Sequence, residues 1–130
     1  ASLRETALRL GYRAAPTMMQ RALVKCVGMT ADLSIYRENR DLLYSMLTSL
    51  GYDCIYPEGA FYLFVKAPVE DAKAFSDSAK KYELLLVPSD DFGIRGYLRL
   101  AYCVPTETIR RSKPAFRALA EEYGLEAKPC

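Results

Sequence analysis

The chain has 130 residues, of which 51% are hydrophobic and 26% charged, and its 18 basic and 16 acidic side chains leave a formal charge of +2. This length is enough for one domain with an apolar core, and the composition is that of a folded protein rather than a disordered one. A charge so close to zero gives no broad field that would attract nucleic acid or an anionic membrane. No apolar run approaches the roughly 20 residues of a membrane span, so we expect neither nucleic acid nor membrane as a partner.

The sequence contains no histidine, which excludes several classes of catalytic and metal site. A Ser-His-Asp triad, a Cys-His pair and an HExxH zinc site all need an imidazole. The four cysteines are far apart and form no CxxC pair, which argues against zinc ribbons and thioredoxin-type redox centres. We expect Cys26, Cys54 and Cys103 to be buried free thiols of a protein in the reducing cytoplasm, and the terminal Cys130 to be exposed.

The opening stretch of the chain indicates two short helices. Ser2 and Glu5 have the spacing of a capping box, and the helix that they begin is expected to end at Gly11. Pro16 suits the first turn of a second helix, which is expected to run to about Val27.

A long amphipathic helix is predicted next, from Asp32 to Leu50, and Gly51 ends it. Its apolar side chains recur at helical spacing and form one broad stripe: Ile35, Tyr36, Leu42, Leu43, Met46, Leu47 and Leu50.

The hydrophobic period then changes to that of short strands and helices. We expect strands at 60–65, 84–87 and 97–104, and helices at 71–81 and from Thr106 to about Tyr123. Pro114 lies inside the last span and predicts a kink or a boundary near Ser112.

Strands that alternate with helices after a helical lead-in indicate an α/β fold, more closely an α+β sandwich. We expect a small sheet of three or four strands with helices packed on one face, preceded by a long N-terminal helical segment. Residues 1–30 are then the helical lead-in and residues 31–130 the compact domain. The order of the strands does not follow from the sequence.

One charged residue interrupts the hydrophobic strand at 97–104. Period-two alternation places Arg99 on the less apolar face, together with Tyr97, Ala101 and Cys103. A planar guanidinium fixed on a rigid strand is suited to binding a carboxylate through two parallel hydrogen bonds. The alternative is an arginine on a solvated sheet face, or one paired with a nearby aspartate.

Two loops are candidates for function. The segment 88–96 is long for a hairpin and contains two glycines, which favours a functional loop. Its adjacent Asp90 and Asp91 are interpreted as solvated turn residues rather than a metal site. Gly59 precedes the strand that contains Phe61 and would allow close approach of a backbone, although an ordinary strand start is the simpler explanation in isolation.

Four motifs follow one another along the chain. They are Ala15–Gln20, Tyr36–Asp41, Pro57–Phe64, and Val87-Pro88 with Phe92-Gly93 leading into Gly96–Tyr102. In this order and spacing they resemble the C-terminal small domain of class I/II (fold type I) pyridoxal-phosphate-dependent aminotransferases, the aspartate aminotransferase superfamily. The resemblance extends from about Gly11 to Tyr123.

The resemblance implies a parent enzyme that transfers an α-amino group between an amino acid and a keto acid by means of pyridoxal phosphate. It implies that Arg99 binds the α-carboxylate of the substrate, and that Phe61 and Gly59 lie beside the substrate pocket. Ser89 departs from the family, which usually has glycine after the proline, and a β-carbon there puts the backbone conformation of the loop in question.

Nothing in the chain matches the lysine that forms the Schiff base in the family, or the other residues that hold the cofactor, which belong to a preceding large domain. Because the chain also begins with Ala1 rather than Met, we expect a fragment that neither binds pyridoxal phosphate nor transaminates alone. We therefore expect no catalytic, cofactor-binding or metal-binding residues in it. Its expected partners are the amino-acid or keto-acid substrate, the large cofactor domain and a second copy, as a homodimer or by self-association of an exposed apolar face.

A different class of function stays open at this point. The chain would then be a freestanding, non-catalytic module that binds a carboxylate or a protein partner, with Arg99 as the contact. RNA binding on the sheet is not favoured, because the aromatic residues are not interleaved with basic runs.

Overall fold

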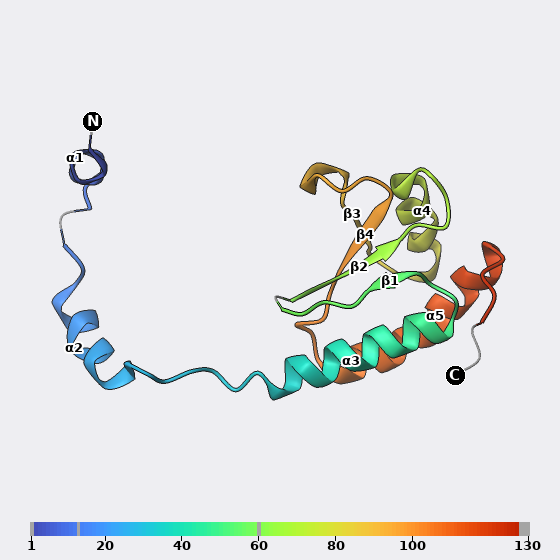
Figure 1. Ribbon diagram of the computed structural model, residues 1–130, viewed down its shortest axis with the longest axis horizontal. Coiled ribbons are helices and arrows are strands. Elements are labelled where there is room, and N and C mark those ends of the chain that lie inside the picture. The colour runs from blue at the N-terminus through green and yellow to red at the C-terminus, as the bar shows by residue number, and fades with distance from the viewer. Residues whose placement is uncertain (1, 13, 60, 128–130) are drawn as a thin grey trace. The chain divides into compact units, whose positions relative to one another are not determined.

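The structure is a computed structural model of the chain, and it describes residues 2–12, 14–59 and 61–127. The chain divides into two compact units, Ala1–Asp32 and Leu33–Cys130, whose elements are labelled in Figure 1.

The first unit contains two short helices, α1 (Leu3–Arg9) and α2 (Thr17–Cys26). Neither helix buries a described residue, and large apolar side chains such as Met18 and Val27 are each 81% exposed. This unit therefore offers apolar surface without a core of its own among the described residues.

The predicted cap at the start of α1 is confirmed. The hydroxyl of Ser2 accepts a hydrogen bond from the backbone N–H of Glu5 at 3.3 Å, which satisfies one of the free amides of the first turn. The carboxylate of Glu5 pairs with Arg9 one turn later, at 3.0 Å.

The second unit is a mixed α/β domain, as the sequence predicts. Its elements in chain order are α3 (Ser34–Ser49), β1 (Cys54–Ile55), β2 (Tyr62–Lys66), α4 (Ala72–Ala79), the 3₁₀ turn η1 (Lys80–Tyr82), β3 (Val87–Pro88), the 3₁₀ turn η2 (Asp90–Phe92), β4 (Tyr97–Ala101) and α5 (Thr106–Glu122). The four strands form one antiparallel sheet in the order β1-β2-β4-β3. Figure 1 shows α3 and α5 running along one side of this sheet.

The register of the two central strands assigns a buried and an open face to the sheet. Leu63 lies opposite Leu100, and Val65 opposite Leu98, and all four are buried. They join apolar side chains of α3, α4 and α5 in a single core, which includes Leu43, Leu47, Phe75, Ile109, Phe116 and Leu119. The alternate positions, such as the pair Phe64 and Arg99, therefore face away from the helices.

A buried polar group joins α3 to the end of β4. The side-chain amide nitrogen of Asn39 donates to the carbonyl oxygens of Tyr102 at 3.1 Å and Val104 at 2.7 Å. The hydroxyl of Thr106, at the start of α5, donates to the amide oxygen of Asn39 at 2.7 Å. These bonds compensate the cost of burying an amide that is fully removed from solvent.

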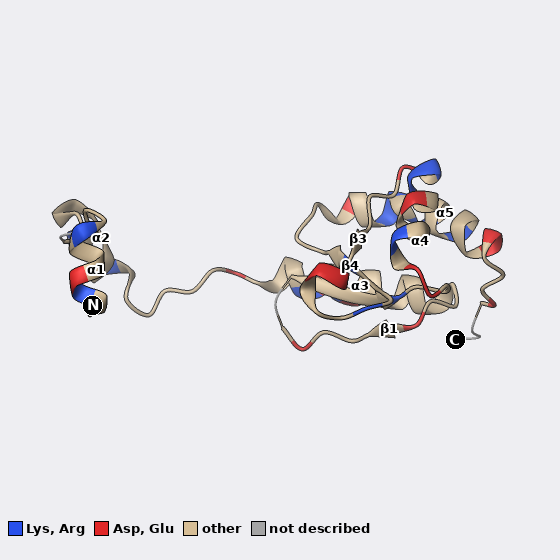
Figure 2. Ribbon diagram, turned by 90° about the horizontal axis from the view of Figure 1, so that it is seen from above, with Lys and Arg blue, Asp and Glu red and all other residues tan. Residues whose placement is uncertain are grey.

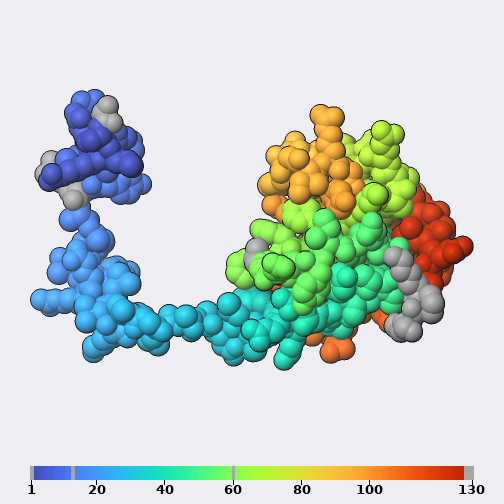
Figure 3. All heavy atoms as spheres, in the orientation of Figure 1, coloured from blue at the N-terminus to red at the C-terminus, as the bar shows by residue number. Residues whose placement is uncertain are grey.

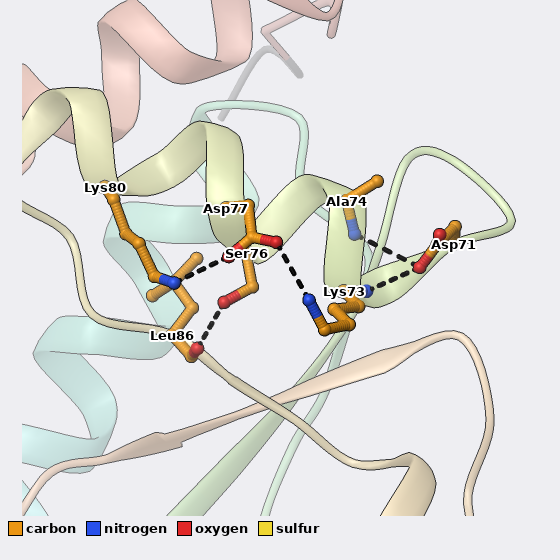
Figure 4. Close-up of polar contacts among 7 residues, drawn as sticks. All are labelled: Asp71, Lys73, Ala74, Ser76, Asp77, Lys80 and Leu86. Atoms are coloured by element: carbon orange, nitrogen blue, oxygen red, sulfur yellow. Dashed lines mark hydrogen bonds and ion pairs between the residues drawn. The ribbon is translucent and has the colours of Figure 1, made fainter.

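The short helix α4 is fixed by polar side chains at its start and near its middle (Figure 4). The Asp71 carboxylate accepts hydrogen bonds from the backbone N–H groups of Lys73 and Ala74, at 2.9 and 3.1 Å, and so caps the helix. The hydroxyl of Ser76 donates to the carbonyl oxygen of Leu86 at 2.6 Å. That bond ties α4 to the segment that leads into β3.

Two predicted strand boundaries are wrong. The strand expected at 84–87 consists of only Val87–Pro88, because pairing with β4 begins at Val87 opposite Arg99. Continued in the same register, Leu86 and Leu85 would lie opposite Leu100 and Ala101, but they are not part of the ladder. The strand β4 itself stops at Ala101 rather than at 104. The two-residue strand β1 has no counterpart among the predicted strands.

The boundary expected near Ser112 is also wrong, because α5 continues through Pro114 as one helix. Ile109 is buried before the proline, and Phe116 and Leu119 after it. Packing of this single face against the core outweighs the hydrogen bond that a proline removes from a helix interior.

The expectation of buried cysteines is wrong as well. Cys26 and Cys103 are exposed and Cys54 is half-buried. Cys26 ends a helix that buries nothing, and Cys103 follows the end of β4, beyond the ladder. Cys130 lies outside the described residues.

Acidic and basic residues are mixed along α3 and α4, whereas the middle of α5 carries four basic residues in succession, Arg110, Arg111, Lys113 and Arg117 (Figure 2). In the described part of the chain, the helices are too short or too polar to cross a lipid bilayer.

Candidate functional site

Arg99 lies at the centre of β4 on the open face of the sheet. The flanking Leu98 and Leu100 are buried on the helix side, while Arg99 itself is half-buried. Strand alternation therefore directs the guanidinium away from the core, as the sequence predicts.

The guanidinium of Arg99 rests against two aromatic rings. Its central carbon lies 4.4 Å from the ring centroid of Tyr62 and 3.9 Å from that of Phe92. Both distances are within the range of cation–π attraction. Tyr62 reaches Arg99 from β2, because the register places it opposite Ala101, two residues along β4 on the same face.

No acidic side chain of the described residues forms an ion pair with Arg99. The ion pairs of that part of the chain involve other cations: Arg9, Arg40, Lys73, Lys80 and Lys81. The guanidinium thus has aromatic neighbours but no protein carboxylate among the described residues, which contradicts the alternative that it pairs with a nearby aspartate.

The loop before β4 brings Phe92 to this position. The hydroxyl of Ser89 is buried and lies 2.7 Å from the carbonyl oxygen of Ile94 and 2.8 Å from that of Tyr97, so it donates across the base of the loop. The backbone of Ser89 has φ −97° and ψ 9°, a conformation open to any residue. The serine therefore does not strain the loop, which lies at the surface of the unit (orange in Figure 3).

Phe61 and Gly59 lie at a second place. The ring of Phe61 packs edge to face on Tyr36 of α3, with centroids 5.3 Å apart. The hydroxyl of Tyr102 donates to the carbonyl oxygen of Gly59 at 3.3 Å. These four residues line a hollow of about 180 Å³ beside the start of α3.

The structure thus brings the predicted residues into two groups rather than one. Arg99 contacts Tyr62 and Phe92, whereas Phe61 and Gly59 contact Tyr36 and Tyr102. Apart from Gly59 itself and its two chain neighbours, no atom of the described residues lies within 4 Å of the position that a β-carbon on Gly59 would take. The close backbone approach expected there is therefore not made within those residues.

Sequence reasoning missed the two aromatic neighbours of Arg99. Tyr62 would follow from the sequence once β2 and β4 were known to pair, since alternation then puts it on the same face. Phe92 belongs to one of the four motifs, but nothing in the sequence indicated its contact with Arg99, because its position depends on the hydrogen bonds that close the loop.

A second arginine, Arg40, contacts both an aromatic ring and a carboxylate. The Nε of Arg40 donates to the carboxylate of Asp41 at 2.9 Å, and its guanidinium carbon lies 4.8 Å from the ring centroid of Tyr56. The hydrogen bond from Arg40, and then that from the Tyr56 hydroxyl at 2.9 Å, lower the pKa of Asp41.

The described residues offer no evident position for a metal or for a covalently bound cofactor. In ranges 2–12, 14–59 and 61–127, no three histidine, cysteine, aspartate or glutamate side chains converge on a point. A lysine that forms a Schiff base is activated by burial or by a neighbouring cation. Every described lysine is instead exposed: Lys25, Lys66, Lys73, Lys80, Lys81 and Lys113.

Comparison with known proteins assigns the chain to a family. The family model described as "Aminotransferase class I and II" matches residues 8–112. Aspartate/prephenate aminotransferase of Thermus thermophilus is 34% identical over 83 residues, which cover 62% of this chain and 22% of that protein.

Solved structures of aminotransferases are also similar to this chain. An amino transferase from Eubacterium rectale is 48% identical and superposes with a TM-score of 0.87 over 90% of this chain and 29% of that one. The aspartate aminotransferase of Thermus thermophilus with maleate has a TM-score of 0.64 at 28% identity, over 79% of this chain and 26% of that one. The chain therefore spans about a quarter of the length of the proteins that it matches. Because the family match covers most of its residues, the chain belongs to the class I and II aminotransferases.

Proposed function

We propose that this chain is the substrate-binding small domain of a pyridoxal-phosphate-dependent aminotransferase, which transfers an α-amino group between an amino acid and a keto acid. In this proposal Arg99 binds the α-carboxylate of the substrate. The observation that carries it is a half-buried guanidinium held by two aromatic rings, with no acidic partner among the described residues. The Thermus thermophilus relative with maleate, itself a carboxylate, agrees with this class of ligand.

The other parts of the chain have subordinate roles in the proposal. Residues 1–30 form the helical connection to the rest of the enzyme, and residues 31–130 form the small domain. Phe61 and Gly59 lie beside the substrate at the hollow that they line, where the open space next to Gly59 leaves room for a ligand or for another domain.

The described residues of this chain do not fit pyridoxal phosphate. The described lysines are exposed and so lack the burial that activates a Schiff-base lysine. Three of them are held in surface ion pairs, Lys73 and Lys80 with Asp77 and Lys81 with Glu122. We therefore assign the cofactor to a large domain outside this chain, assign no step of the reaction at the cofactor to these residues, and expect the chain alone to be inactive.

The proposed partners follow from the same surfaces. The substrate meets Arg99, and the large cofactor domain is the partner of the exposed apolar side chains. A second copy, in a homodimer, is the further partner that we propose. Exposed side chains of the first unit, among them Leu3 and Met18 at 92% and 81%, support such contacts. The alternative of a freestanding carboxylate- or protein-binding module is not favoured by the comparisons.

The test is Arg99→Ala in the intact enzyme that contains this chain. Removing one partner of a buried charge pair costs about 2–5 kcal/mol, so kcat/KM for amino-acid substrates should fall about thirty- to several-thousand-fold. Arg95→Ala, in the exposed loop just before β4, is the matched control and should leave kcat/KM within about twofold. An unchanged kcat/KM for Arg99→Ala would refute the proposed role.

A further inference from the structure

We propose that Tyr62 and Phe92 are positioning residues that hold the guanidinium of Arg99 in one plane, and that they make the site selective for a planar carboxylate over a tetrahedral anion. The inference rests on the proposed function of Arg99, and it assigns the selectivity to two residues that do not themselves bind the acid.

The order of the strands brings the two rings to Arg99 from two different elements beside β4. β4 lies between β2 and β3 in the sheet. Tyr62 belongs to β2, whereas Phe92 belongs to η2, which directly follows β3. A guanidinium that extends from the middle strand therefore meets one ring from each neighbouring strand, at 4.4 and 3.9 Å.

Each ring is held in place by hydrogen bonds that do not involve Arg99. Tyr62 is paired in the β2–β4 ladder. The backbone N–H of Phe92 donates to the carbonyl oxygen of Ser89 at 2.9 Å, and the Ser89 hydroxyl closes the loop. The two rings remain 40% and 53% exposed, so the apolar core does not account for their positions, and their common contact is the guanidinium.

A guanidinium whose central carbon lies over aromatic rings keeps its N–H edge as the surface through which it binds a ligand. Two parallel hydrogen bonds from that edge match the two oxygens of a carboxylate that lies in the same plane. A tetrahedral anion such as sulfate can place only two of its four oxygens in that plane, so it matches the edge of a fixed guanidinium less completely. The arrangement therefore favours a planar acid.

Arg40 supports this interpretation from within the same unit. Its guanidinium has an aromatic ring, that of Tyr56 at 4.8 Å, and a carboxylate, that of Asp41 at 2.9 Å. Arg99 has the rings, and the described residues supply no acid to it. A ligand carboxylate would occupy the place that Asp41 takes beside Arg40.

The rings also affect affinity. A long, flexible side chain loses rotamer freedom when it binds a ligand, at a cost of about 0.5–1.5 kcal/mol. A guanidinium that the rings already hold has lost that freedom in the free protein. Removing one ring should therefore weaken carboxylate binding by about two- to tenfold.

The experiment uses the full 130-residue chain labelled with ¹⁵N and follows the Nε–Hε signal of Arg99, which is assigned by its loss in Arg99→Lys. Sodium acetate and sodium sulfate are titrated separately at constant ionic strength. In the wild type we expect this signal to be shifted upfield by the ring currents, and to respond to acetate at lower concentration than to sulfate. In Tyr62→Leu and in Phe92→Leu the upfield shift should decrease and acetate binding should weaken by about two- to tenfold, with sulfate binding little changed.

Three control variants keep the result interpretable. Tyr56→Leu removes an aromatic contact from Arg40 instead of Arg99 and should not change the response. Tyr62→Phe and Phe92→Tyr keep a ring at each position and should keep the wild-type selectivity, even if a leucine variant fails to fold.

The possible failures are distinct. If the leucine variants bind acetate as tightly and as selectively as the wild type, or if the ring-preserving variants lose selectivity, the inference is overturned while the proposed function of Arg99 stands. If the wild-type Arg99 signal does not respond to acetate at all, both are overturned.

Discussion

The side-chain amide of Asn39 and the carbonyl oxygen of Val104 are 2.7 Å apart, although 65 residues separate them in the sequence. The same amide also bonds Tyr102, and it accepts a hydrogen bond from Thr106. One fully buried side chain thereby fixes where β4 ends and α5 begins relative to α3. Since the hydroxyl of Tyr102 in turn contacts Gly59, this clamp also supports the hollow beside Phe61.

Replacing Asn39 by alanine should destabilise the Leu33–Cys130 unit by about 2–3 kcal/mol, because buried carbonyl and hydroxyl groups lose their partner. Urea unfolding followed by circular dichroism measures the change. Glu38→Ala, at an exposed position on the same helix, should change the free energy of unfolding by less than about 0.5 kcal/mol. Equal effects of the two substitutions would show that the Asn39 network contributes nothing specific.

Ser89→Ala should lower the free energy of unfolding by about 1–2 kcal/mol, because the base of the loop loses a buried hydrogen bond. Ser89→Gly should cost a further 0.5–1 kcal/mol or so, since glycine adds backbone freedom where φ is already −97°. The order wild type, alanine, glycine is measurable by thermal or urea unfolding. A stabilising glycine would mean that the loop prefers another conformation.

Alanine substitutions at Gly51 and Gly124 can separate two costs to stability, that of an unfavourable backbone conformation and that of a steric collision. Both have positive φ, at +91° and +65°, so alanine at either position should cost about 1–2 kcal/mol. A β-carbon at Gly51 would also collide with the main chain of Glu126, whereas nothing lies within 4 Å of one at Gly124. Gly51→Ala should therefore destabilise the protein more than Gly124→Ala in urea unfolding, and should shift the backbone NMR signals around Glu126. Equal losses would contradict this packing of the C-terminal segment.

Asp77 should make stability depend on pH in the acid range. Hydrogen bonds from Lys80 and then Lys73 lower its pKa below the ordinary value of 3.8 (Figure 4). A lowered folded-state pKa contributes stability that is fully present above the unfolded-state pKa and is lost as the pH falls through the folded value. Wild type should therefore be slightly more stable than Asp77→Asn at pH 7, and the difference should vanish below pH 3.8.

Urea unfolding at a series of pH values measures this difference. Asp53→Asn, at an exposed position without an ion pair among the described residues, supplies the comparison. A gap between wild type and Asp77→Asn that stays constant down to pH 2 would argue against the role of the two lysines.

The sequence predicts those parts of the fold that depend on local periodicity. The stripe of α3 and the alternation around Arg99 both appear in the structure. The extent of β3 was not predictable in this way. Leu84 and Leu86 are buried and Leu85 is 84% exposed, which is the alternation of a strand, yet pairing with β4 begins only at Val87. Ladder length depends on the pairing of distant strands, and no local pattern encodes that.

In the candidate site, too, some features follow from the local sequence and others depend on tertiary contacts. The outward position of Arg99 follows from its neighbours in the sequence, whereas its contact with Phe92 depends on a loop closed by Ser89. The continuity of α5 through Pro114 likewise depends on a core built from other elements. In each case the local sequence does not identify the residues that will pack against this segment in the folded protein.

The pairing of β2 with β4 has a consequence for how the chain matures during translation. Tyr62 meets Ala101, and Lys66 meets Tyr97, so the central ladder forms only after the ribosome has released most of the domain. Until then the apolar stripe of α3 is exposed to water, and the side-chain amide of Asn39 lacks the carbonyl groups of Tyr102 and Val104 to which it donates. Such a nascent intermediate is a natural client for chaperones, and slowing elongation before residue 104 should increase the time over which it aggregates.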